Sequence, residues 1–108
     1  MKSGQSLSDR LLGLFPSSED NLIAVEIIKF LKKDPKEVHS KGYPGPKRKN
    51  IIKYVQNILN EKHGYHDVKI IDSVITQLES HCIIHPRDEK KKGKNRHYSL
   101  DRAYEEFD

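Results

Sequence analysis

Apolar side chains recur at helical spacing in two stretches of the N-terminal third of the chain. The first stretch ends before Pro16, which stops a helix, and its single stripe consists of Leu7, Leu11, Leu14 and Phe15. The second begins at two serines followed by two acids, a typical helix start, and its stripe consists of Ile23, Ile27, Phe30 and Leu31. We therefore predict a short helix over residues 6–15 and a long helix that ends near Lys33.

Two further stripes predict a second and a third long helix. Residues 35–46 precede them and hold three prolines and two glycines, which indicates a loop, with a very short strand possible at Val38. The second long helix begins near Lys47 and stops at Gly64, and its buried positions are Ile51, Val55, Ile58 and Leu59. Asp67 caps the third, whose apolar positions are Val68, Ile71, Val74, Ile75 and Leu78. The turn between these helices is so short that they must pack at an angle, as in a helix-turn-helix.

After the third helix the pattern changes to short β-prone runs. Residues 82–84 form the first run, and a polar loop over residues 87–95 follows it. Residues 96–100 then alternate as a half-buried strand does, with Tyr98 and Leu100 on one face. We predict a β-hairpin around a basic loop.

The order of helix, helix, turn, helix, strand, basic loop and strand resembles the winged-helix (winged helix-turn-helix) superfamily. The resemblance covers residues 19–100, and the residues that carry it are Leu78, Cys82-Ile83-Ile84, the loop 87–95 and His97-Tyr98-Ser99-Leu100. It implies a mainly helical α+β fold in which the hairpin is the wing. Around residues 19–100 we place an N-terminal helix and linker at 1–18 and an acidic tail at 101–108. One departure is that His81-Cys82 replaces the usual glycine after the third helix.

Positive charge is concentrated in two segments. The 108 residues, a length that fits one domain, carry 20 Lys and Arg against 16 Asp and Glu, for a formal net charge of +4. Residues 36–66 hold seven basic and two acidic groups, and residues 86–100 hold six and two. Localised charge of this kind favours a polyanion, above all nucleic acid. The alternative is a solvated lysine-rich surface, in which the two segments are unrelated in space.

The candidate nucleic-acid contacts lie on three predicted elements. The wing contributes Arg87, Lys90, Lys91, Lys92, Lys94 and Arg96, and the start of the second long helix contributes Lys47, Arg48, Lys49 and Lys53. The exposed face of the third helix offers Lys69, Ser73, Thr76 and Gln77. The winged-helix resemblance implies that this helix enters a DNA major groove while the wing touches the backbone. Asp72 on the same face opposes this interpretation because a carboxylate repels phosphate.

These contacts predict a domain that binds double-stranded DNA mainly through its backbone. The alternative is a protein-interaction winged helix in a nuclear or transcription-related complex, which is favoured by the sparsely basic third helix, the acidic tail and the stripe of Leu7, Leu11, Leu14 and Phe15. That stripe either folds back onto the domain, which is the commoner fate of a short amphipathic helix, or docks on another copy or another protein. Pro46-Lys47-Arg48-Lys49 resembles a nuclear-import signal, which predicts an intracellular, nuclear location. No apolar run is long enough to cross a bilayer, so we expect no membrane partner.

Metal binding and catalysis have weaker support. His63 and His66 have ligand-like spacing, as do Cys82 and His85, but the two pairs flank opposite ends of the predicted third helix. A helix of that length spans on the order of 20 Å, so one ion cannot bind both pairs. The sequence has no phosphate-binding glycine loop, serine elbow or other familiar catalytic motif. We expect no cofactor, no metal and no enzymatic activity.

Overall fold

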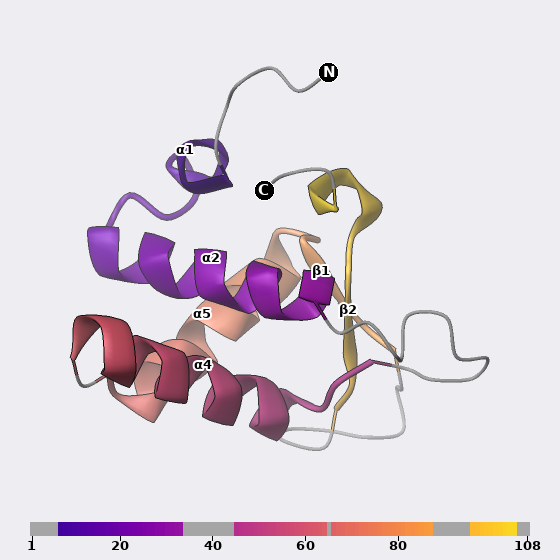
Figure 1. The fold of residues 1–108 in the computed structure, drawn as a ribbon. Helices are drawn as coiled ribbons and strands as arrows, with labels where there is room; N and C mark the ends of the chain where they lie inside the picture. The colour runs from indigo at the N-terminus through magenta and orange to yellow at the C-terminus, as the bar shows by residue number, and fades with distance from the viewer. Residues whose placement is uncertain (1–6, 34–44, 65, 88–95, 106–108) are drawn as a thin grey trace.

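The computed structural model describes residues 7–33, 45–64, 66–87 and 96–105. In these residues four α-helices surround a common core and a two-stranded antiparallel sheet flanks them, with a 3-10 turn at the end (Figure 1). The helices are α1 (Leu7–Leu11), α2 (Ser18–Lys33), α4 (Arg48–His63) and α5 (Val68–Ser80). The strands and the turn are β1 (Ile84–Pro86), β2 (Tyr98–Leu100) and η2 (Arg102–Tyr104). The mainly helical α+β class is confirmed, and the layout is compatible with a winged helix.

The core lies where α2 packs against α1, α4 and α5 (Figure 1). Most residues of the predicted stripes of the three long helices point into it, and the fully buried ones are Ile23, Ile27, Ile51, Val55, Leu59, Ile71, Val74, Ile75 and Leu78. Ile58, predicted to be buried, is only half-buried and lies outside this core. Burial of such apolar surface is the main stabilising contribution to a domain of this size. The helical periods therefore identified the core-facing side of each long helix.

The ends of the long helices also agree with the sequence. The side chain of Asp67 accepts a hydrogen bond from the backbone N–H of Lys69 at 2.8 Å and caps α5 as predicted. Gly64 lies at the C-cap of α4 with a positive φ of 89°, where glycine is favoured. Val68, the first residue of α5 and a predicted apolar position, is 40% exposed and lies outside the core.

The N-terminal helix is shorter than predicted. It ends at Leu11, and the chain then turns so that the backbone N–H groups of Leu14 and Phe15 both bond the carbonyl of Leu11. Leu7, Leu11 and Phe15 are buried, whereas Leu14 is 37% exposed because the turn carries it off the helical stripe.

Of the two outcomes expected for this stripe, the structure shows the segment folded back onto the domain, since three of the four stripe residues lie inside the protein's own core and are not available for docking. Hydrogen bonds hold the segment in place. The Ser8 hydroxyl donates to Asn21 Oδ1 at 2.7 Å, and Asn21 Nδ2 donates to the Ser8 carbonyl at 3.0 Å. The N-terminal helix is therefore an internal packing element that fastens onto α2.

The first strand begins later than predicted. Cys82 has a φ of 60°, in the left-handed region, so it ends α5 instead of starting a strand. The backbone N–H of Cys82 bonds the Glu79 carbonyl and that of Ile83 bonds the Leu78 carbonyl, both at 3.0 Å. This pair of bonds is a Schellman motif, in which glycine normally occupies the position of Cys82. The motif explains why β1 starts only at Ile84.

Replacing Cys82 by glycine should raise the free energy of unfolding by up to about 1 kcal/mol. A side chain at this positive φ costs roughly 1–2 kcal/mol, and the greater freedom of glycine in the unfolded chain offsets part of the gain. Cys82→Val should be destabilising, because β-branched residues tolerate this conformation worst. Urea unfolding of both variants, with Cys82→Ala as the reference, measures the difference. A valine variant as stable as the glycine variant contradicts this account.

The predicted hairpin is present, with β1 and β2 paired so that His85 faces Ser99. A third segment joins it, because Lys47 forms an antiparallel bridge with His97. Val38, the predicted site of a short strand, lies outside the described residues. Gly45, just before the bridge, has a φ of 101°, and a Cβ there would overlap the carbonyl of Tyr98. The pairing therefore requires glycine at this position.

The described part of the predicted acidic tail is packed onto the domain. Tyr104 in η2 is buried, and the guanidinium of Arg10 from α1 lies 5.8 Å from the centre of its ring. His85 Nε2 donates to Asp101 at 2.7 Å, and this bond lowers the pKa of Asp101 below its usual value. The structure thus ties the C-terminal turn to both α1 and β1.

Candidate nucleic-acid interface

Backbone pairing brings the two basic segments of the sequence together. The backbone N–H of Arg48 donates to the Arg96 carbonyl at 2.8 Å, and that of Tyr98 donates to the Pro46 carbonyl at 3.0 Å. Along the opposite edge of β2, where the two strands of the hairpin pair, the N–H of Arg87 donates to the His97 carbonyl at 2.9 Å. Figure 1 shows the magenta start of α4 beside β2. The start of α4 and both ends of the predicted wing therefore lie at one place.

Several predicted contact residues are exposed here. Lys49 and Lys53 lie on the outer face of α4, and Arg87 is exposed at the end of β1. Lys47 is half-buried, because its backbone takes part in the bridge to His97. The four wing lysines, Lys90, Lys91, Lys92 and Lys94, lie outside the described residues.

Arg48 has a different role from the predicted phosphate contact. Its guanidinium donates to Asp72 Oδ1 and the Asp72 carbonyl, both at 2.7 Å, to Thr76 Oγ1 at 2.7 Å and to the Tyr98 hydroxyl at 2.8 Å. Four of its five N–H donors are thus used within the protein. Burial works to lower the pKa of Arg48, but the bonds to Asp72 and Tyr98 raise it. Arg48 fixes α4 against α5 and β2.

The same cluster continues to Arg96, the last cation of the predicted wing. The Tyr98 hydroxyl donates to Glu79 Oε1 at 3.1 Å, and Arg96 donates to Glu79 Oε2 at 3.3 Å. Burial raises the pKa of Tyr98, although the bond from Arg48 opposes the shift. Arg96 is half-buried, and its charge is partly balanced by the ion pair with Glu79 of α5. The network holds the base of the hairpin against α5.

The polar face of α5 carries the remaining predicted contacts. Lys69 and Ser73 are exposed, and Gln77 Nε2 donates to Ser73 Oγ at 3.3 Å one turn away. Thr76 accepts from Arg48 and donates to the Asp72 carbonyl, so its hydroxyl is engaged. The Asp72 carboxylate is paired with Arg48, which reduces the repulsion that the sequence predicted at this face. Sequence spacing does not signal this ion pair, because its partners lie 24 residues apart.

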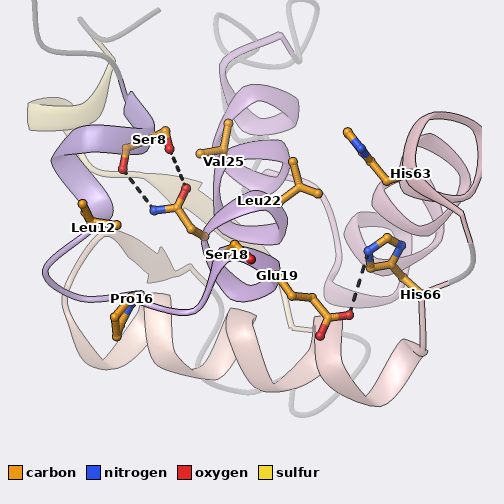
Figure 2. Close-up of a pocket in the computed structure, with 10 residues that line it drawn as sticks. Ser8, Leu12, Pro16, Ser18, Glu19, Leu22, Val25, His63 and His66 are labelled. Atoms are coloured by element: carbon orange, nitrogen blue, oxygen red, sulfur yellow. Dashed lines mark hydrogen bonds and ion pairs between the residues drawn. The ribbon is translucent and has the colours of Figure 1, made fainter.

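A groove of about 580 Å³ lies at the opposite end of α4 (Figure 2). Its lining includes Leu12, Leu22, Glu19 and His66, and His66 Nε2 lies 3.9 Å from Glu19 Oε2. His66 is buried, and its Nδ1 donates to the Gly64 carbonyl at 2.9 Å, so it fastens the turn between α4 and α5. Within the described ranges no three His, Cys, Asp or Glu side chains are grouped to hold a metal ion.

None of the described helices is both long and apolar enough to cross a membrane. The chain matches no family model, no curated protein and no solved structure.

Proposed function

We propose that this chain is a winged-helix domain that binds double-stranded DNA, mainly through the phosphate backbone. The observation that carries the proposal is the pairing of residues 46–48 with residues 96–98, which joins the two basic segments. A duplex that reaches one segment then reaches the other. Cations gathered in this way bind DNA by releasing counterions, without reading its sequence.

Each element has a distinct part in the proposal. Lys47 contacts phosphates from the N-cap of α4, Lys49 and Lys53 do so from within α4, and Arg87 and the four wing lysines do so from the hairpin. Lys69, Ser73 and Gln77 face the duplex from α5, where amide and hydroxyl groups can bond base edges. Arg48, Arg96 and Thr76 hold these elements in position. The nuclear location stays a prediction that accompanies DNA binding.

The protein-interaction alternative has lost its main support. Of the apolar stripe that favoured it, only Leu14 remains exposed, and the carboxylate of Asp72 is paired with Arg48. A partner would have to use other surfaces.

The double variant Lys49→Ala, Lys53→Ala should weaken binding to every duplex sequence to a similar degree. If each lysine neutralises one phosphate, the slope of log affinity against log salt should become shallower by about 1.8. Replacing Lys90, Lys91 and Lys92 with alanine should make the slope shallower still. The changes caused by the two sets of substitutions should add, because both segments would contact one duplex. Fluorescence anisotropy with labelled duplexes at several salt concentrations measures these slopes.

Lys62→Ala is the matched control. Lys62 is exposed in the last turn of the same helix, roughly 20 Å along the axis from Lys49, so its loss should leave the slope unchanged. If Lys62→Ala changed the salt slope per lysine as much as the Lys49→Ala, Lys53→Ala double variant does, a localised interface would be contradicted. A wild-type domain that shows no salt-dependent binding to duplex DNA would overturn the proposal.

A further inference from the structure

An aromatic pair lies at the surface between α2 and α4. The rings of Phe30 and Tyr54 stack with centroids 4.3 Å apart and an angle of 27° between their planes. Tyr54 is 36% exposed, and within the described part of the chain it is the only aromatic among the exposed large apolar side chains. Because Phe30 covers one face of the ring, the exposed area lies on the other face and the edge.

The core beneath the pair is already filled by aliphatic residues. Ile27 of α2 and Ile51 and Val55 of α4 are fully buried, whereas Phe30 is only partly buried and packs against their cluster. Phe30 therefore supports the Tyr54 ring from below. Because the Tyr54 ring is already held by Phe30, it loses little conformational freedom when a flat ligand stacks on it.

The surroundings of Tyr54 are cationic and amide-rich. Lys53 precedes it, Asn50 lies one turn before it, and both side chains are exposed. The sequence of α4 contains no carboxylate before Glu61. On α2, Lys29 next to Phe30 is exposed, while Glu26 one turn earlier is buried. The ring therefore lies next to Lys53, one of the lysines that we assign to the DNA backbone.

We infer that the Phe30–Tyr54 pair is a stacking platform for an unpaired base, in a single strand that continues from the bound duplex. The inference rests on the proposed function and extends it to junctions between double-stranded and single-stranded DNA. A base inside a duplex has both faces covered by its neighbours, but a base in an overhang can place one face on Tyr54. Lys53, the neighbouring residue on α4, can contact a phosphate of this strand, because cationic side chains beside a stacking ring follow the backbone of single-stranded DNA.

The test compares a blunt duplex with the same duplex carrying a short single-stranded overhang. The wild-type domain should bind the overhang duplex more tightly, by roughly tenfold for one stacked base. Tyr54→Ala should lose this preference and bind both DNAs with the affinity of the wild type for the blunt duplex. Tyr54→Phe should keep the preference, because the ring is retained. Anisotropy titrations at one salt concentration give all the affinities.

Two controls separate stacking from structural damage. Tyr54→Leu keeps an apolar side chain against Phe30 without a ring, so it should also lose the preference, with a melting temperature close to that of the wild type. Val68→Ala removes a similarly exposed apolar side chain from α5 and should keep the preference. A wild type that binds both DNAs equally, or a Tyr54→Leu variant that keeps the preference, overturns the inference alone. Absence of binding to either DNA overturns it together with the proposed function.

Discussion

Replacing Gly45 by alanine should lower the free energy of unfolding by about 3 kcal/mol and weaken DNA binding as well. The positive φ of 101° alone costs a side chain about 1–2 kcal/mol. The new Cβ would also overlap the Tyr98 carbonyl, so the strand-like segment before α4 must move and lose hydrogen bonds worth about 1 kcal/mol each. Urea unfolding and duplex titration of the variant measure the two effects.

Gly13→Ala is the matched control for this prediction. Nothing lies within 4 Å of a Cβ built on Gly13, which stands in the exposed turn after α1. Alanine there should leave stability unchanged or raise it slightly, by reducing the freedom of the unfolded chain. Similar losses at Gly45 and Gly13 would show that the close approach of Gly45 to β2 does not hold in solution.

Replacing Leu11 by alanine should destabilise the domain by about 2–5 kcal/mol, whereas Leu14→Ala should cost less than about 1 kcal/mol. The two residues are of the same type and three positions apart, but Leu11 is fully buried and Leu14 is exposed in the turn. Truncating a buried leucine removes its contacts and leaves a cavity, which accounts for the larger loss. Thermal and urea unfolding of the two variants compares them directly.

A small and equal loss in both leucine variants would mean that α1 is detached from the core in solution. The docking-stripe interpretation would then regain its support, because Leu7, Leu11 and Phe15 would form an exposed apolar patch. Sedimentation of the wild type would in that case reveal self-association that the Leu11 variant lacks.

The helices were predictable from sequence because their signals are local. The stripe of α5 repeats every three or four residues, and Asp67 before it is a cap that acts two residues away. At Leu14 and Cys82 local signals failed. The apolar spacing of the N-terminal stripe continues through Leu14, although the backbone has already turned there. No residue pattern around Cys82 indicates that its backbone adopts the left-handed conformation.

The sequence predicted which charged residues belong to the candidate interface, but not how the fold places their side chains. Counting charges located the basic segments, yet it gave Arg48 and Lys49 the same role. Only the fold separates them, since Arg48 bonds Tyr98, 50 residues away, while Lys49 faces solvent. The sequence likewise did not predict the bridge between Lys47 and His97, because a single bridged residue produces no alternation of apolar and polar positions. The contacts assigned to the wing lysines stay a prediction.

The pairing of Gly45 with His97 has a consequence for the order of folding. His97 Nδ1 donates to the Gly45 carbonyl across 52 residues of chain, so this bond closes a loop that contains all of α4, α5 and β1. Closing so long a loop costs conformational entropy that the contacts within each helix do not incur, so we expect the helices to form first and this pairing to form late. The candidate interface would then be completed at the end of folding. DNA bound across both segments would hold the loop closed and slow its opening.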